Sequence, residues 1–316
     1  MIEGKKTEKP NYFYYFMAIF AFLIWGTSFA FGKLISPEPL NPIVISCFRT
    51  IIGVITLLLI VITSKKTTQW AKDFKTHFIK YMIIGIIFYA ISFLLEYWSL
   101  SLTKSSNQAI LSNTLIIWVV IINLIFFKSK LSKIFLLGLT TAIIGVLLIL
   151  VNDDLNFSTE TIVGDVGSLI AYVFWGAYSA LMAKINAKTD PLFSTLSIFI
   201  TSSFIFLPLT IFSGGLSDIS VATLFDWGVL LYLGIFCSGI AFWLYNRALS
   251  NENISSEYIA IYSLLNPIIG VIMGVLLHGD LIPIRKIIGI CLILGAIIIV
   301  NRSTYPNAEI EEIQKE

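Results

Sequence analysis

The stretch Leu23–Lys33, LIWGTSFAFGK, places a tryptophan close to the middle of a hydrophobic run that extends from about residue 13 to residue 34. A run of this length can cross a lipid bilayer as an α-helix. Tryptophan normally concentrates where lipid meets water, so the central position of Trp25 needs a reason. The small residues of Gly26–Ser28 follow it. They favour either a helix-packing face or a cavity wall in which an aromatic plate lies beside hydroxyl groups.

The composition is that of a membrane protein. Of the 316 residues, 57% are hydrophobic and 13% are charged, and the mean hydropathy is +0.89. Soluble domains carry about 25% charged residues. The three cysteines lie inside hydrophobic runs without a C-x-x-C pair, and the two histidines lie near the ends of such runs, so we expect no disulfide, metal site or cofactor. The net charge of +2, with the lysines spread over the loops, gives no reason to expect nucleic acid as a partner.

Hydrophobic runs separated by turn signals divide the chain into ten predicted transmembrane helices with short connections. The first run is interpreted as a retained helix and not as a signal peptide. The predicted spans are 13–34, 42–63, 78–102, 106–127, 133–151, 162–184, 192–213, 226–249, 257–278 and 284–301. The predicted fold class is therefore an all-α integral membrane protein.

The basic residues predict the orientation of these spans. With the N-terminus placed inside, most of the 21 lysines and arginines fall in the inside segments. The two longest outside loops carry aspartate and glutamate but no lysine or arginine. Because cytoplasmic loops are enriched in lysine and arginine, we expect a multi-pass protein of the cell membrane with both termini in the cytoplasm.

The opening motif has a counterpart in the second half of the chain. Trp25-Gly26-Thr27-Ser28 returns as Trp175-Gly176-Ala177-Tyr178, 150 residues later, and Gly85 returns as Gly234 at nearly the same spacing. Two five-span repeats are therefore predicted, at 13–151 and 162–301, between terminal tails at 1–12 and 302–316. Since five is odd, the second repeat enters the membrane in the opposite direction. Many secondary transporters are built from such inverted repeats and bind substrate near the membrane midplane between them.

With these motifs the chain resembles the drug/metabolite transporter superfamily, specifically its ten-helix EamA group. The similarity extends from about residue 13 to residue 301 and includes the two tryptophan motifs, Arg49 in the second span, the segment Ser99–Ala109 and the pair Asn266-Pro267. In the fourth span Ile116 stands where the family has a proline. The resemblance implies a secondary transporter that exports small metabolites, often amino acids or related amines and carboxylates.

Arg49 and Glu96 are charged residues inside predicted spans, where charge is costly. At 1.5 Å per residue they lie about 10 Å and about 9 Å from the same membrane surface, on consecutive helices. Three interpretations stand. The two form a structural ion pair; or Arg49 faces a substrate carboxylate, or Glu96 an amine or a proton; or the side chains extend to the surface.

Amide and aromatic side chains complete the candidate site. Asn113 and Asn266 lie in the fourth and ninth spans, where amides can recognise a polar solute or join two helices by hydrogen bonds. Trp118 lies near the middle of the fourth span and is a further candidate for the cavity wall. The full set of candidates is Trp25, Ser28, Arg49, Glu96, Asn113, Trp118, Trp175, Tyr178 and Asn266.

The favoured function is a secondary transporter, preferably an exporter, of small polar metabolites such as amino acids or related amines. The expected partners are a small-molecule substrate and the lipid bilayer, with proton coupling and a homodimer through Gly270 and Gly274 as further options. Transport of nucleotide-type or phosphorylated metabolites is the main alternative, but phosphate favours several lysines and arginines at the cavity. A membrane-embedded enzyme or sensor is the other alternative, although the sequence has no histidine cluster and no nucleotide-binding loop.

Overall fold

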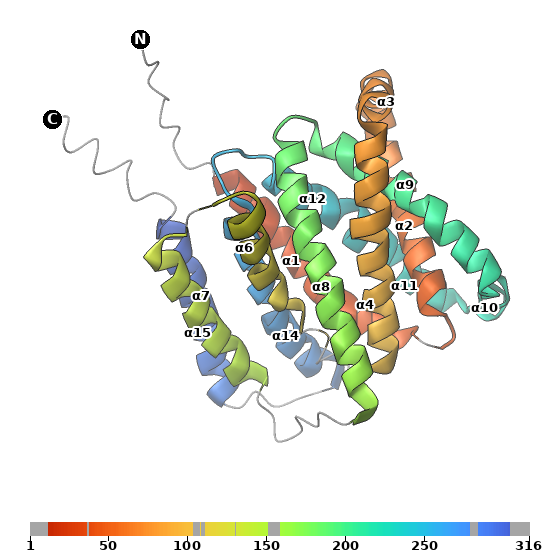
Figure 1. Cartoon of the computed structure of the whole chain (residues 1–316). Helices are drawn as coiled ribbons and strands as arrows, with labels where there is room; N and C mark the ends of the chain where they lie inside the picture. The colour runs from red at the N-terminus through yellow and green to blue at the C-terminus, as the bar shows by residue number, and fades with distance from the viewer. Residues whose placement is uncertain are drawn as a thin grey trace, which may run out of the picture.

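The computed structural model describes residues 12–36, 38–103, 108, 111–129, 131–150, 159–278 and 284–303. Within these residues every regular element is helical, and the helices group into ten consecutive units (Figure 1). The first five units are α1 (Tyr12–Leu34); α2 (Pro42–Thr63); α3 (Thr67–Ile83), η1 (Ile84–Ala90) and α4 (Ile91–Leu102); α6 (Thr114–Phe126); and α7 (Lys133–Leu150). The second five are α8 (Thr159–Asn186); α9 (Pro191–Phe212); α11 (Leu224–Tyr232), η2 (Leu233–Ile240) and α12 (Ala241–Ala248); α13 (Ser256–Ala260), η3 (Ile261–Leu265) and α14 (Asn266–His278); and α15 (Ile284–Ser303). A short helix, α10 (Gly215–Val221), connects α9 to α11, and the predicted tails lie almost wholly outside the described residues.

Six of the helical stretches are long and apolar enough to cross a membrane by length and composition. They are Tyr12–Leu34, Pro42–Thr63, Thr67–Leu102, Ile162–Asn186, Pro191–Phe212 and Leu224–Ala248. Two shorter apolar helices, Thr114–Phe126 and Lys133–Leu148, add to them. The predicted all-helical membrane fold is confirmed.

The third span begins earlier than predicted. We expected residue 78 as its start, but the helix already begins at Thr67 and includes a basic segment interpreted as a loop. Trp70 and Phe74 stack one turn apart on this segment, with ring centroids 5.7 Å apart. The Trp70 indole also donates to Ser197 Oγ at 3.2 Å, so an aromatic stripe holds this extension against α9.

The second helix of each repeat begins with the same kind of cap. The Asn41 side chain accepts from the backbone N–H of Ile43 at 2.9 Å, and the Asp190 side chain accepts from that of Leu192 at 3.0 Å. A proline follows each cap, at the first helical position, where the missing N–H costs nothing. The two caps lie 149 residues apart, as the repeat requires.

The third helix of each repeat changes from α to π geometry at the same place. The segments η1 and η2 begin at Ile84 and Leu233, again 149 residues apart. Each contains one of the glycines that marked the repeat, and each lies against the second helix of the other repeat. A Cβ at Gly85 would lie 2.2 Å from Thr201 Oγ1, and a Cβ at Gly234 would lie 2.4 Å from Ile52 Cβ. Both glycines are therefore required for close helix packing.

The glycines of the two tryptophan motifs also allow close packing of helices. A Cβ at Gly26 would meet Ile269 Cβ at 2.6 Å, and a Cβ at Gly176 would meet Trp118 Cβ at the same distance. α1 thus packs closely on α14, and α8 packs closely on α6. The packing interpretation of the small residues is correct for these two glycines, and the close approach fixes the position of the tryptophan beside each of them.

The crossing of the two repeats defines the centre of the molecule. α1 also packs against α12, and α8 also packs against α4, so the first helix of each repeat contacts the third helix of the other. Figure 1 shows α1 and α8 in the middle of the bundle, whereas α7 and α15 lie side by side at one edge.

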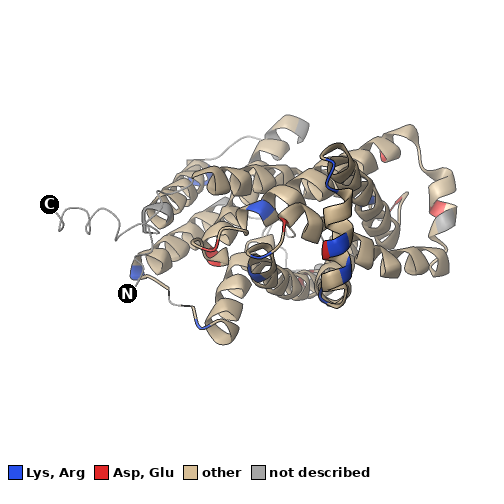
Figure 2. Cartoon of the chain, turned by 90° about the horizontal axis from the view of Figure 1, so that it is seen from above, with Lys and Arg blue, Asp and Glu red and all other residues tan. Residues whose placement is uncertain are grey.

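One face of the bundle carries the basic connections. The start of α1, the end of α15 and the connection between α2 and α3 lie on the same face in Figure 1. Figure 2 looks down on this face and shows lysine and arginine residues around its loops and helix ends. We call it the terminal face, and the one across the bundle the opposite face.

Candidate functional site

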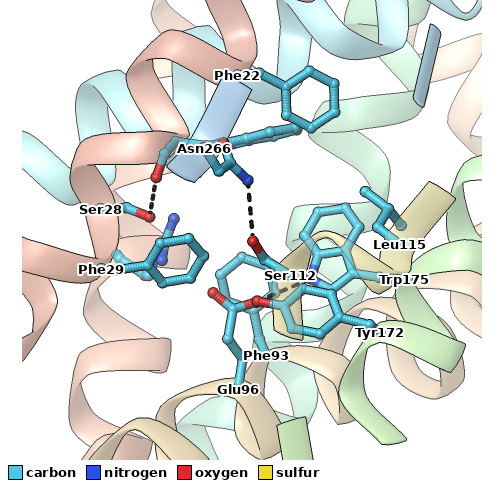
Figure 3. Close-up of a pocket in the computed structure, with 12 residues that line it drawn as sticks. Phe22, Ser28, Phe29, Phe93, Glu96, Ser112, Leu115, Tyr172, Trp175 and Asn266 are labelled. Atoms are coloured by element: carbon cyan, nitrogen blue, oxygen red, sulfur yellow. Dashed lines mark hydrogen bonds between the residues drawn. The ribbon is translucent and has the colours of Figure 1, made fainter. Parts of the chain in front are cut away.

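A central pocket lies where helices of the two repeats meet. It is narrow: the centre of a water-sized molecule can occupy about 40 Å³ of it, within about 420 Å³ of atom-free space that includes open solvent. Aromatic rings, a few polar groups and two charged side chains make its wall, a composition typical of small-molecule sites. Figure 3 shows Glu96, Trp175 and Asn266 extending toward the pocket from different helices. The lining residues are Phe22, Trp25, Ser28, Phe29, Arg49, Phe93, Glu96, Ser112, Leu115, Tyr172, Trp175 and Asn266.

The two motif tryptophans meet in this wall. The ring centroids of Trp25 and Trp175 are 5.7 Å apart at an interplanar angle of 62°, an edge-to-face contact. The Trp25 indole donates to the backbone carbonyl of Cys237 at 2.7 Å, within the π segment η2. The Trp175 indole donates to Glu96 Oε2 at 3.0 Å. Each tryptophan therefore finds a polar partner inside the bundle, which explains why it lies away from the lipid–water interface.

Arg49 is buried, at 1% exposure, and is held from two sides. Its Nε donates to Ser238 Oγ at 2.9 Å, and one terminal nitrogen donates to the Tyr97 hydroxyl at 2.5 Å. The guanidinium lies over the Phe93 ring, 4.6 Å from the centroid. A guanidinium has five N–H donors, and within the described residues these two bonds are the ones it makes. The remaining N–H groups of the guanidinium can therefore donate to a ligand at the edge of the pocket.

Glu96 lines the same pocket and is also buried. Its side chain accepts from Trp175, and its backbone carbonyl accepts from Gln108 Nε2 at 3.3 Å. The two ion pairs found among the described residues are Lys66–Asp190 and His77–Asp73, and neither contains Arg49 or Glu96.

The expected ion pair between Arg49 and Glu96 is therefore wrong as a direct contact. Phe93 and Tyr97 cover the guanidinium, while the carboxylate turns to the indole of Trp175. Surface extension is also wrong for Arg49, because the side chain is buried. The two groups still attract each other at longer range, across the pocket wall.

Ser28 and Asn266 lie on the pocket wall with local hydrogen bonds. The Ser28 hydroxyl donates to the backbone carbonyl of Trp25 at 2.7 Å. Asn266 Nδ2 donates to Ser112 Oγ at 3.3 Å and so joins α14 to the residues just before α6 (Figure 3). Asn266 also begins α14 directly after the 3-10 segment η3, so its amide lies at the helix break.

Three sequence candidates lie behind the wall and are not among the residues that line the central pocket. Trp118 is half-buried and its Cβ packs on Gly176. Asn113 is buried and directly follows Ser112, which does line the pocket. The Tyr178 hydroxyl accepts from Asn246 Nδ2 at 2.9 Å, and its ring packs edge-on against Trp175. These residues support the wall from the second layer.

Sequence reasoning missed several pocket residues. Phe93 lies three positions before Glu96 and Tyr172 three positions before Trp175, so each shares a helix face with a residue that was selected. Helical spacing from the two chosen residues was the signal that could have found them. Ser238, which bonds to Arg49 from η2 but is not among the lining residues, had no such signal in the sequence.

The comparison with known proteins agrees with this arrangement. Two segments of the chain, residues 12–151 and 162–302, match the EamA-like transporter family. The chain belongs to the EamA-like transporter family. The resemblance seen in the sequence motifs is confirmed, and the EamA-like protein is a membrane transporter of the drug/metabolite superfamily.

Curated relatives of this EamA-like protein are named transporters without further description. An uncharacterized transporter of Archaeoglobus fulgidus is 28% identical over 250 residues, which covers 78% of the present chain and 82% of the relative. One from Clostridium kluyveri is 25% identical and covers 90% and 92%, respectively. The uncharacterized transporter YetK of Bacillus subtilis is 25% identical and covers 92% and 88%.

A crystal structure of another protein has the same fold. It superposes with a TM-score of 0.74 at 15% sequence identity, over 92% of the present chain and 97% of that chain. Within the described part of the EamA-like protein, no three His, Cys, Asp or Glu side chains come close enough to hold a metal ion. The described polar lining of the central pocket includes Arg49, Glu96 and the amide of Asn266, set among aromatic rings.

Proposed function

We propose that this EamA-family protein is a secondary transporter that exports small zwitterionic metabolites, such as amino acids, across the cell membrane by alternating access. The observation that carries the proposal is the charge arrangement of the central pocket. Arg49 and Glu96 both line it, both are buried, and they form no ion pair with each other. A bound zwitterion supplies the two missing partners, with its carboxylate at Arg49 and its ammonium at Glu96.

The charge of the pocket favours such a solute over phosphorylated cargo. Among the described residues that line the pocket, Arg49 is the single cationic one. A phosphate carries close to two negative charges and favours several cationic partners.

Uptake by liposomes that contain the purified protein tests the proposal. A panel of labelled amino acids, amines and nucleotides is measured with and without a proton gradient. The amino acid with the highest uptake is then compared with its decarboxylated amine and its deaminated acid. We expect the zwitterion to be preferred over both, because each analogue leaves one buried charge unpaired. Faster uptake of nucleotides, or uptake no faster than in empty liposomes, would contradict the proposal.

The orientation has its own test. The lysines and arginines of the terminal face support a cytoplasmic location for that face (Figure 2). A reporter inserted after Thr68 should then report the cytoplasm and one inserted after Ser217 the outside, because the two positions lie on opposite faces of the bundle. Both reporters on one side, or an exchange of the two, would overturn this orientation.

A further inference from the structure

A second cavity opens on the terminal face of the bundle. It is larger than the central pocket, with about 1080 Å³ of space that includes open solvent. We call it the vestibule. The lining residues are Asn123, Phe127, Ser129, Ala180, Ala183, Lys184, Ala187, Lys188, Leu249, Asn251, Glu252, Asn253, Ile254, Ser255, Ser256 and Glu257. Both repeats contribute to it, through the end of α6 and through α8 and the connection from α12 to α13.

The vestibule contains a buried carboxylate that sequence reasoning did not select. Glu257 is 0% exposed and lies in the first turn of α13. One carboxylate oxygen, Oε2, accepts from Asn123 Nδ2, and the same amide nitrogen lies 2.7 Å from Ser256 Oγ. The other oxygen, Oε1, has no hydrogen-bond partner among the described residues. A buried carboxylate oxygen without a donor is costly, so this atom marks a place for a ligand donor.

A cationic side chain lies in the same cavity without an ion pair. Lys184 is exposed, and its ammonium lies over the Phe127 ring, 5.1 Å from the centroid. It lines the same cavity as Glu257. The ion pairs of the described residues contain neither Lys184 nor Glu257. The aromatic ring therefore holds the ammonium group beside the cavity while it stays available to an anion.

The vestibule thus repeats the charge arrangement of the central pocket. Each cavity contains a buried carboxylate and a cation that do not pair with each other, and the exposed residues Lys188 and Glu252 add two further charges to the vestibule. The same helices line both cavities. Trp175 of α8 lines the central pocket and Lys184 lines the vestibule, nine residues or about 13 Å farther along the helix. On α6, Leu115 lines the central pocket and Asn123 lines the vestibule, about 12 Å farther along the helix.

We propose that the vestibule is a second binding site for the zwitterionic solutes of the central pocket, in which Glu257 Oε1 binds the ammonium group and Lys184 binds the carboxylate. The proposal rests on the proposed function for its class of ligand. The solute occupies this site before it reaches the central pocket from the terminal face. Because Lys184 is exposed and solvated, binding in the vestibule is weaker than in the central pocket.

A fluorescent reporter in the vestibule tests the proposal without transport. Asn253 is exposed on the wall, so Asn253→Cys can carry an environment-sensitive dye, with Cys291→Ser to remove the one cysteine that is exposed among the described residues. The full chain in nanodiscs is titrated with L-leucine, isoamylamine and isovalerate, which share an isobutyl group and differ in the charged groups that it carries. Arg49→Met is included throughout, because it removes the cation of the central pocket. We expect L-leucine to bind at least tenfold more tightly than either analogue.

Matched variants assign the two charges. Glu257→Gln should weaken binding of L-leucine and isoamylamine about tenfold or more and leave isovalerate unchanged. Lys184→Met should weaken L-leucine and isovalerate and leave isoamylamine unchanged, and as an exposed substitution it should not affect folding. The controls are Glu252→Gln and Lys188→Met, which remove exposed charges of the same cavity and should change binding less than twofold.

Several outcomes would overturn the proposal. Equal effects of Glu257→Gln and Glu252→Gln would show a general electrostatic field and no site. Equal affinity for L-leucine and isovalerate, or a dye response that disappears with Arg49→Met, would also do so. Since binding is measured with the central cation removed, a negative result here leaves the uptake preference of the proposed function untouched, and a failed uptake screen leaves this measurement interpretable.

Discussion

The two repeats share one backbone plan but differ in the polar residues that they bury. In the first repeat Arg49, Glu96 and Tyr97 bring two charges to the central pocket. The positions 149 residues later hold Ile198, Tyr245 and Asn246, which carry no charge. The first repeat therefore supplies the described charged residues of the central pocket, although both repeats build the framework around it.

In the second repeat, buried polar residues hydrogen-bond to one another. Asn246 Nδ2 lies 2.9 Å from both the Tyr178 hydroxyl and Thr195 Oγ1, and Asn186 donates back to the Asn246 carbonyl at 3.1 Å. The Tyr245 hydroxyl donates to Ser179 Oγ at 2.8 Å. This neutral network closes on itself, whereas the charges of the first repeat remain available to a solute. The positions equivalent to Arg49 and Glu96 are thus neutral in the second repeat, where buried polar side chains bond to one another, while the first repeat places its charges at the central pocket.

The largest effect on transport should come from Arg49, a charged residue that the second repeat replaces with a neutral one. Arg49→Met should lower kcat/KM for zwitterion uptake about 100-fold, since the loss of one partner from a buried charged contact costs about 2 to 5 kcal/mol. The measurement is initial uptake per mole of monodisperse protein. Lys75→Met, which removes an exposed lysine, is the control and should transport normally. Normal uptake by Arg49→Met would remove the distinction between the repeats.

Glu96→Gln should have the next largest effect, about tenfold on the amino acid, because glutamine can still accept from the Trp175 indole but offers no negative charge. Uptake of the amine analogue should fall more than uptake of the deaminated acid. If Glu96 also carries the coupling proton, the Glu96→Gln variant should still exchange substrate across the membrane but should no longer respond to a pH gradient. The double variant with Arg49→Met should show no rescue of folding, and a clear rescue would restore the ion-pair interpretation.

The neutral network of the second repeat should respond in stability and not in transport. Asn246→Leu leaves several buried polar groups without a partner, each at about 1 to 3 kcal/mol, so the melting temperature in detergent should fall by several degrees. Uptake per folded molecule should change less than twofold. Tyr97→Phe, at the matching position of the first repeat, should change uptake more than melting temperature, because it removes the hydroxyl that binds the Arg49 guanidinium. Equal behaviour of the two variants would contradict the division of roles.

Trp118→Ala should have the smallest effect on transport. The side chain packs behind the wall, so the KM for uptake should stay within about twofold while the yield of folded protein falls. Trp175→Ala is the matched comparison, since this ring lines the pocket and bonds to Glu96. Its KM should rise about tenfold. A larger change in KM for Trp118→Ala than for Trp175→Ala would place the pocket on the other side of α6.

Hydropathy and spacing predicted most of the fold and the centre of the site. The period of 149 to 150 residues depends on glycines and tryptophans that also make the close contacts, so the sequence signal and the packing have the same cause. Trp25, Ser28, Arg49, Glu96, Trp175 and Asn266 reach the central pocket together.

Depth along a helix did not predict which way a side chain turns. Arg49 and Glu96 have similar depth, but rings from the same helix as Glu96 cover the guanidinium. Trp118 has the right depth and lies beside Gly176, behind the wall. Glu257 is the first residue of the predicted ninth span, and nothing in the sequence indicated that its side chain is buried. Its burial comes from the way the α12–α13 connection folds over α6. Rotation about the helix axis and loop placement are tertiary properties that one sequence does not display.

The paired π segments set the helical phase of the pocket residues. A π turn contains one residue more than an α turn, so every side chain beyond η1 is rotated by about 100° relative to an unbroken helix. The Trp70 side chain before the segment bonds to Ser197 of α9, while Glu96 beyond it faces the pocket. Deleting one residue within Ile84–Ala90 would thus leave the span, its hydropathy and its length almost unchanged and turn the carboxylate away from Trp175.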